Sequence, residues 1–177
     1  LAAAVAQSVL AESTVNEAAV VWVRCGGEAP GDILDALASR LIEQGFPVEE
    51  SGFRALAPGA KIDRVRRALL DSPVVLVVLD DAHYLEQMDS LLLAVPPAVP
   101  VLTTSRVRFP CEKTCEVVEL AGNDAAHLLA FHAGNPALRS DWYALELCGM
   151  LGFHPYAIEL AGRLIQTLNM PAKVLIE

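Results

Sequence analysis

The six residues Val74–Leu79 are all Val or Leu, and two adjacent acids, Asp80 and Asp81, follow them directly. A continuous apolar run without the alternation of a half-exposed strand is typical of a strand that is buried on both faces of a parallel sheet. The carboxyl ends of such strands lie at the edge where α/β proteins bind their ligands. The run therefore predicts a parallel sheet covered by helices, with polar chemistry at its carboxyl edge.

A second apolar run, Val101–Thr104, ends in a similar way and is followed by Ser105 and Arg106. Carboxylates suit a hydrated Mg²⁺, whereas a guanidinium beside hydroxyl groups suits a phosphate. Because the carboxyl ends of parallel strands meet at one edge of a sheet, the two strand ends together predict a nucleoside triphosphate site.

At such a site Asp80 would hold Mg²⁺ through water, and Asp81 would orient or deprotonate the attacking water. Arg106 would contact the γ-phosphate, while Thr104 and Ser105 would supply hydrogen bonds. Each residue also has a plainer structural role. Asp80 can bond to backbone groups, Asp81 can cap the next turn, and Arg106 can pair with a surface acid. The apolar run before the acids and the TTSR segment after them favour the functional interpretation.

Charge and cysteine content narrow the classes of function. A net charge of −9 and a pI near 4.9 argue against attraction of the whole surface to nucleic acid or to an anionic membrane. No apolar run approaches the ~20 residues that cross a bilayer. The four cysteines are scattered without a CxxC pair, which is typical of reduced thiols in a cytoplasmic protein. A basic cluster at helical spacing predicts the solvated face of a helix: Lys61, Arg64, Arg66 and Arg67.

The order of predicted elements is that of an α/β domain. An Ala-rich helix over the first dozen residues precedes a strand at 19–24, a helix capped by Asp32 and a helix at 61–70. The two apolar runs supply the next strands, with a short helix between them within 82–95, and a last strand is expected at 116–120. This alternation predicts a mainly parallel sheet with right-handed crossovers.

The pattern changes after Gly122, because helices follow there without strands. Three helices are predicted there. The first is capped by Asn123 or Asp124 and ends at Ala133, and the other two span about 141–150 and 155–167. We therefore expect an α/β domain at 1–121 and a small all-α subdomain at 122–177.

Between the last two helices, the dipeptide His154-Pro155 forms a predicted corner. Gly152 suits the end of one helix, and Pro155 suits the first position of the next. Such a corner is a rigid apolar surface on which a planar base can pack, or else an ordinary turn between helices. His154 taken alone is more typical of a turn histidine than of an acid or base.

Four segments, in this order, resemble the motifs of the STAND class of signalling ATPases and, within it, the NB-ARC-like domains. AVVWVR (19–24) looks like the second strand of that family, VVLVVLDD (74–81) like its Walker B strand and VLTTSR (101–106) like its sensor-one strand. CGMLGFHPYAIELAG (148–162) is similar to its GxP motif, with a short insertion. The resemblance covers nearly the whole chain, and four ordered motifs are more specific than any one of them.

The resemblance implies a P-loop NTPase-type (ASCE) α/β core with a parallel sheet, followed by a small helical subdomain, and it implies ATP or ADP with Mg²⁺ as ligands. It assigns Asp80 to Mg²⁺, Asp81 to water activation and Arg106 to γ-phosphate sensing. The remaining implied nucleotide contacts are Thr104, Ser105, His154 and Pro155, the last of them to adenine. Family members switch between an ADP-held closed form and an ATP-driven oligomer. Self-association, flanking effector and sensor domains and a cytoplasmic location are therefore implied.

One motif of the family is missing from this sequence. No GxxxxGK[ST] occurs, so the backbone amides and the Lys that cradle the β- and γ-phosphates are absent. Leu1-Ala2-Ala3 looks like the continuation of the helix that follows this loop, and we expect the loop and the first strand to lie upstream. The parent protein is then expected to be an ATPase, whereas residues 1–177 alone are expected to lack phosphate affinity and activity.

Two other functions remain open. One is a non-catalytic regulatory or scaffold module with a structural nucleotide or a decayed site, although the presence of both Asp80 and Asp81 argues against decay. The other is a DNA-associated AAA+ ATPase, which can share the LDDAH and TSR strand ends. Such proteins are expected to carry an Arg soon after the Gly of the helical lid, where this chain has Pro155-Tyr156-Ala157 and its next Arg is Arg163. That departure and the acidic charge place this alternative last.

Overall fold

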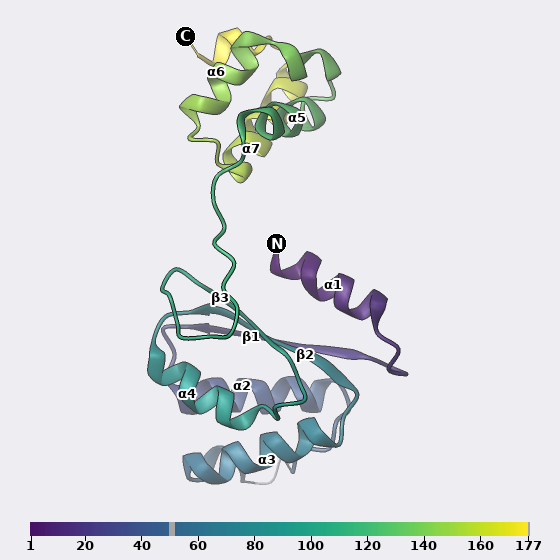
Figure 1. The fold of residues 1–177 in the computed structure, drawn as a ribbon, viewed down its shortest axis with the longest axis vertical. Helices are drawn as coiled ribbons and strands as arrows, with labels where there is room; N and C mark the ends of the chain where they lie inside the picture. The colour runs from purple at the N-terminus through teal and green to yellow at the C-terminus, as the bar shows by residue number, and fades with distance from the viewer. Residues whose placement is uncertain (50–51, 177) are drawn as a thin grey trace. The chain divides into compact units, whose positions relative to one another are not determined.

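The two apolar runs form neighbouring strands of a three-stranded parallel sheet, as predicted (Figure 1). The computed structural model describes residues 1–49 and 52–176, and its strands are, in spatial order, β1 (Ala19–Gly26), β2 (Val74–Ala82) and β3 (Val101–Ser105). The sheet belongs to the first of two units, Leu1–Cys111, and each unit is described by itself. The expected α/β class with a parallel sheet is confirmed.

Helices cover both faces of β2, the central strand. Val77 and Leu79 are fully buried in the larger core, whereas Leu76 and Val78 belong to a smaller core on the opposite face. Burial on both faces explains why the run has no polar alternation. The helices of this unit are α1 (Ala2–Glu12), α2 (Pro30–Glu43), α3 (Pro58–Leu70) and α4 (Leu85–Ala94), with one turn of 3₁₀ helix, η1, at Phe53–Ala55.

The two faces of the sheet are covered unequally. On one side α2 packs on β1, and α3 and α4 pack against α2. On the other side α1 alone lies against β1 and β2, where its buried Ala6 meets Val20 and Trp22. Because the strands are parallel, their carboxyl ends lie at one edge of the sheet, where Gln87 of α4 bonds to Gly26 O at the end of β1.

Lys61 departs from the predicted solvated face of α3. Its side chain is 7% exposed, and its Nζ donates to Asp35 Oδ1 on α2 at 2.6 Å. The ammonium also lies 5.8 Å from the ring centroid of Phe53. Helical spacing identifies the face on which Lys61 lies, but a carboxylate from another helix turns this position into a buried ion pair.

The second unit, Glu112–Glu177, is a bundle of helices. Its core is formed largely by Ala and Leu together with Ile158 and Cys148. Asp141 caps α6, because its Oδ1 accepts a hydrogen bond from Tyr143 N. The helices are α5 (Gly122–His132), α6 (Trp142–Met150) and α7 (Pro155–Leu168), with short 3₁₀ helices η2 (Pro136–Ser140) and η3 (Ala172–Leu175).

The strand expected at 116–120 does not form, so that prediction is wrong. The segment between β3 and α5 has neither helix nor strand, and Val117 and Val118 are largely exposed. Leu120 N instead donates to Phe153 O of the helical unit. A β-branched pair favours a strand only where another strand completes the ladder, and none of the described strands pairs with this segment.

Two predicted helix caps also differ in the structure. Asp32 lies in the first turn of α2, whose N-cap is Ala29, and a proline takes the first helical position. Asn123 and Asp124 lie inside α5, whose N-cap is Ala121. Both Asp32 and Asp124 therefore act on the helix through its dipole, because acids in the first turn stabilise the positive end.

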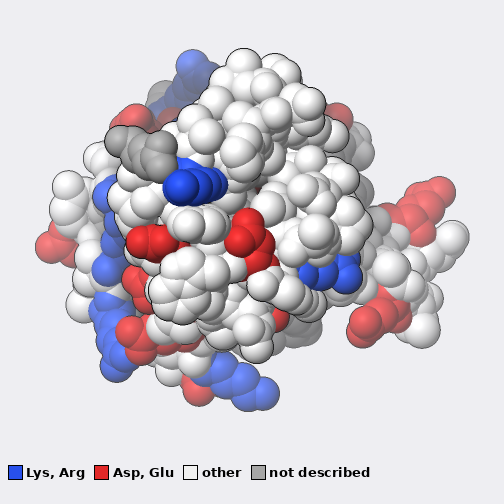
Figure 2. Space-filling model, turned by 90° about the horizontal axis from the view of Figure 1, so that it is seen from above, with Lys and Arg blue, Asp and Glu red and all other residues white. Residues whose placement is uncertain are grey.

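Apolar side chains on the surface are frequent in the helical unit. Trp142 is 72% exposed and Tyr143 is 40% exposed, so neither belongs to the core. Four residues of α7 at intervals of four are also exposed: Tyr156, Leu160, Leu164 and Leu168. Figure 2 shows a face of the molecule on which uncharged residues form the largest continuous area. Among the described residues, no helix has both the length and the apolar character required to cross a membrane.

Gly162 marks the closest approach of α7 to α5. A Cβ at this position would lie 2.7 Å from the Cβ of His132 and 3.0 Å from Leu129 O. Gly162→Ala should therefore lower the free energy of unfolding of this unit by about 1–3 kcal/mol, since overpacking outweighs alanine's better helix propensity. Thermal or denaturant unfolding, followed by circular dichroism, measures this change.

Gly149 in α6 is the matched control for this substitution. A Cβ there meets only the Phe153 ring, at an ordinary 3.7 Å. Gly149→Ala should therefore raise the free energy of unfolding, by up to about 1 kcal/mol. Equal effects of the two substitutions would contradict the close packing of α5 on α7.

Candidate functional site

A β-bulge brings both acids of β2 against one residue of β3. Leu79 pairs with Thr103 and Ala82 with Ser105, so Asp80 and Asp81 together oppose Thr104. The Thr104 hydroxyl donates to Asp80 Oδ1 at 2.6 Å and accepts from Asp81 N at 2.9 Å. Thr104 therefore fixes the backbone of one aspartate and the side chain of the other.

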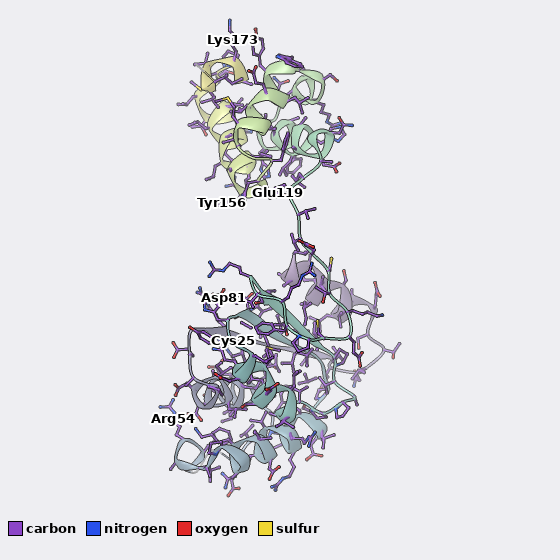
Figure 3. The ribbon with its side chains drawn as sticks, turned by 60° about the vertical axis from the view of Figure 1, so that its left-hand side comes forward. Cys25, Arg54, Asp81, Glu119, Tyr156 and Lys173 are labelled. Carbon is purple, nitrogen blue, oxygen red and sulfur yellow. The ribbon has the colours of Figure 1, made fainter. Side chains whose placement is uncertain are left out.

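Asp81 has a left-handed backbone, with φ at 59°. Asp and Asn adopt this conformation more readily than other residues that carry a side chain. Asp81 lies at the edge of the sheet at which the strands end (Figure 3).

Three cationic or titratable groups surround the carboxylate of Asp81. His83 Nε2 lies 3.1 Å from Oδ1, and Arg106 Nη2 lies 3.8 Å from the same atom. Arg24 Nη2, at the end of β1, lies 3.6 Å from Oδ2. The hydrogen bond from His83, and then the positive charges of His83, Arg106 and Arg24, hold the pKa of Asp81 below its ordinary value. Asp81 is therefore a carboxylate at neutral pH.

The residues Arg24, Asp80, Asp81, His83, Thr104 and Arg106 are called the strand-end cluster below. It unites four residues that the sequence singled out with two that it did not, Arg24 and His83. Arg24 carried a usable signal, because it is the polar residue that ends the apolar run of β1. His83 carried none beyond its closeness to the acids in the chain.

Ser105 serves the turn after β3. Its hydroxyl donates to Ala82 O at 2.6 Å and accepts from Val107 N at 2.9 Å. These two bonds tie the end of β3 to the end of β2 and set the direction in which the chain continues to Arg106.

Gln87 is a buried polar residue that joins two loops at the same edge. Its side-chain nitrogen donates to Gly26 O and Glu28 O, and its side-chain oxygen accepts from the backbone N–H groups of His83 and Tyr84. Gln87 is 1% exposed and fully hydrogen-bonded, so it holds the loop after β1 against the loop after β2. Nothing in the sequence distinguishes it from a solvated helix residue.

Cys25 lies buried beneath the acids of β2 (Figure 3). Burial first, and then the negative charges of Asp80 and Asp81, raise the pKa of its thiol to about 11. Without a bound metal the thiol is therefore protonated at physiological pH and is a poor nucleophile.

Asp80 offers the kind of oxygen donor that Mg²⁺ uses. Its Oδ1 is engaged by Thr104, and its Oδ2 has no hydrogen-bond partner within residues 1–49 and 52–176. No group of three or more His, Cys, Asp or Glu that could hold a metal occurs among those residues. Mg²⁺ commonly uses one or two carboxylates, with water and phosphate oxygens as its other ligands, and the donor set fits that arrangement.

His154 and Pro155 belong to the second unit, at the start of α7. Both are exposed, Pro155 takes the first helical position, and His154 is the N-cap without a side-chain capping bond. The preceding residues Gly152 and Phe153 both have positive φ, at 62° and 54°. These two left-handed residues form the tight corner that the sequence predicted.

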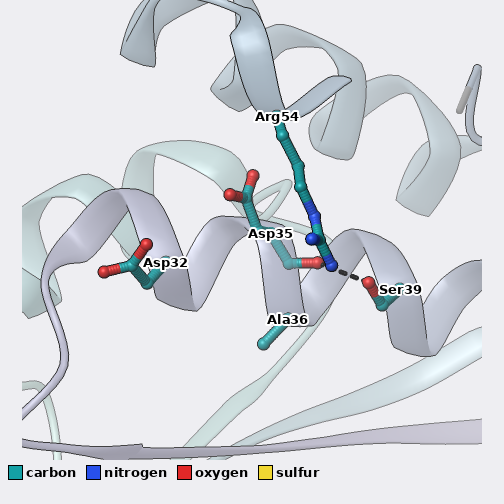
Figure 4. Close-up of a pocket in the computed structure, with 5 residues that line it drawn as sticks. All are labelled: Asp32, Asp35, Ala36, Ser39 and Arg54. Atoms are coloured by element: carbon teal, nitrogen blue, oxygen red, sulfur yellow. Dashed lines mark hydrogen bonds between the residues drawn. The ribbon is translucent and has the colours of Figure 1, made fainter. Parts of the chain in front are cut away.

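A hollow of about 360 Å³ lies on α2 and contains no residue of the strand-end cluster (Figure 4). Its lining residues are Asp32, Asp35, Ala36, Ser39 and Arg54. The Asp35 carboxylate is paired with Lys61, and the Ser39 hydroxyl donates to Asp35 O at 2.9 Å. With these groups engaged inside the protein, the strand-end cluster is the better candidate for chemistry.

No protein-family model and no curated protein sequence matches this chain.

Proposed function

We propose that this chain forms most of the nucleotide-binding unit and the adjoining helical unit of a STAND-type ATPase switch, which binds ATP or ADP with Mg²⁺. In that role Asp80 holds the metal, Asp81 activates water, and Arg106 senses the terminal phosphate. Mg²⁺ would supply charge stabilisation on the phosphate oxygens. Thr104 positions both acids.

The observation that carries this proposal is the strand-end cluster itself. Three parallel strands bring two carboxylates, a hydroxyl and two guanidinium groups to one edge of the sheet, and the closest contacts join neighbouring strands. Phosphoryl transfer needs this combination, since catalysis there is mostly positioning and neutralisation of charge.

A non-catalytic nucleotide-binding or scaffold module is the second candidate. It would be favoured if no GxxxxGK[ST] loop accompanies these 177 residues in the full-length protein. In that case the cluster would bind nucleotide, or would stabilise the sheet edge, without turnover.

Arg106→Ala in the full-length protein tests the proposed function. Loss of a guanidinium that contacts only the terminal phosphate should weaken ATP binding about tenfold and leave ADP binding within about twofold. Isothermal titration with ATP and with ADP measures both affinities.

Arg139→Ala, an exposed arginine of the helical unit, is the control and should leave both affinities unchanged. If wild-type protein binds neither nucleotide, or if Arg106→Ala weakens ATP and ADP binding equally, the proposed function is wrong.

A further inference from the structure

Arg24 has no role in the function proposed so far, yet it reaches the same carboxylate as Arg106. It lies near the carboxyl end of β1, where its backbone pairs with that of Asp80 in the neighbouring strand. Its side chain is 78% exposed and crosses to Asp81, with Nη2 3.6 Å from Oδ2. The Arg24 side chain thus stays largely solvated while its guanidinium faces the strand-end cluster.

Arg24 and Arg106 approach Asp81 from opposite neighbouring strands. Arg24 faces Oδ2, whereas Arg106 faces Oδ1 at 3.8 Å and is 83% exposed. The two guanidinium groups therefore flank one anion, each on its own oxygen. Both contacts are longer than a charge-assisted hydrogen bond, and both arginines are solvated, so neither ion pair is a strong constraint.

An anion with more charge and more oxygens than a carboxylate would hold this pair of arginines better. A terminal phosphoryl group carries up to two negative charges, and its oxygens accept forked bonds from more than one guanidinium. We propose that Arg24 and Arg106 form a two-arginine clamp for a terminal phosphoryl group. Asp81 is the internal anion that holds both arginines when no phosphate is bound. This inference rests on the proposed function and extends it to β1.

The clamp also changes the surroundings of the Asp81 carboxylate when phosphate binds. While both arginines face Asp81, they are engaged by a carboxylate of the protein; when they turn to a phosphoryl group, that carboxylate is released toward water. The phosphate source is either the γ-phosphate of ATP or free phosphate beside bound ADP, and the chemistry at the arginines is the same.

A double-mutant cycle of Arg24→Gln and Asp81→Asn in the full-length protein distinguishes a phosphate clamp from a plain ion pair between Arg24 and Asp81. If Arg24 serves only Asp81, its replacement has no effect on nucleotide binding once Asp81 is already Asn. If Arg24 binds phosphate, Arg24→Gln weakens ATP binding about tenfold in both backgrounds and changes ADP binding less than twofold. Titrations with ATP, with ADP, and with inorganic phosphate added to the ADP-bound protein give the three readouts.

Two further variants serve as controls. Arg40→Gln removes an exposed arginine on α2 that pairs with Glu43, and it should change none of the affinities. Arg24→Lys keeps the charge without the fork and should give an intermediate loss for ATP. Loss in the phosphate titration as well as with ATP assigns the clamp to both sources, and loss with ATP alone assigns it to the γ-phosphate.

The inference is overturned if Arg24→Gln leaves ATP binding unchanged in the Asp81→Asn background, or if it weakens ATP and ADP equally. A failure of the proposed function has a different signature: wild-type protein then binds neither nucleotide, or Arg106→Ala has no selective effect. If Arg106→Ala weakens ATP binding as expected and Arg24→Gln does not, the two-arginine clamp is refuted but the proposed function is not.

Discussion

Asp81→Asn in the full-length protein should slow ATP hydrolysis by about 10²–10⁴-fold while ATP still binds. The carboxylate is the group near the strand ends with the geometry of a base: it is ionised at neutral pH, partly exposed and turned out of the strand by its left-handed backbone. An amide cannot take a proton from water. Asn also adopts the left-handed conformation readily, and its Oδ1 can accept the bond from His83, so the local fold should be kept.

Single-turnover hydrolysis and equilibrium binding of ATP measure the two parts of this prediction separately. Asp89→Asn, on the exposed side of α4, is the matched control and should leave the rate unchanged. An Asp81→Asn protein that hydrolyses ATP at the wild-type rate would remove Asp81 from catalysis and favour the non-catalytic alternative.

The position of the acids could be predicted from the sequence, because it depends on one local fact. A run of Val and Leu that is buried on both faces must end where the chain leaves the sheet, and Asp80 and Asp81 follow that run. The same reasoning located Thr104 and Arg106. It also applies to Arg24, the charged residue that follows the apolar run of β1.

The contacts within the strand-end cluster could not be predicted in the same way. The bulge that sets Asp80 and Asp81 against Thr104 depends on the register between β2 and β3, and register is a property of two strands. The left-handed backbone of Asp81 and its contact with His83 follow from that bulge. Sequence alone therefore identified four of the six residues of the cluster, Asp80, Asp81, Thr104 and Arg106, but not the contacts that join them.

Other predictions from the sequence differ from the structure for the same reason, because they depend on residues that are far apart in the chain. Helical spacing placed Lys61 on a polar face, but its burial depends on Asp35, which lies 26 positions away in the chain. The segment 116–120 has the composition of a strand, yet a strand needs a partner for its backbone groups. Gln87 is polar and helical, and only the two loops that it joins explain its burial.

Asp80→Asn should have the other large effect, on the dependence of the protein on Mg²⁺. Asp80 Oδ2 has no hydrogen-bond partner in the part of the chain that the structure describes, and oxygen is the donor that Mg²⁺ prefers. The substitution replaces a charged oxygen donor with an amide, while Asn Oδ1 can still accept the Thr104 hydroxyl. The Mg²⁺ concentration for half-maximal ATP hydrolysis should rise about tenfold or more, with a lower maximal rate.

A Mg²⁺ titration of ATP hydrolysis by the full-length protein is thus the most direct test of the central claim, that the carboxyl edge of this sheet is the metal and terminal-phosphate side of a nucleotide site. The expected result is Mg²⁺-dependent turnover in wild type and in Asp89→Asn. For Asp80→Asn, the Mg²⁺ concentration for half-maximal hydrolysis should be about tenfold or more higher. Turnover by Asp80→Asn with the wild-type Mg²⁺ dependence would contradict the claim.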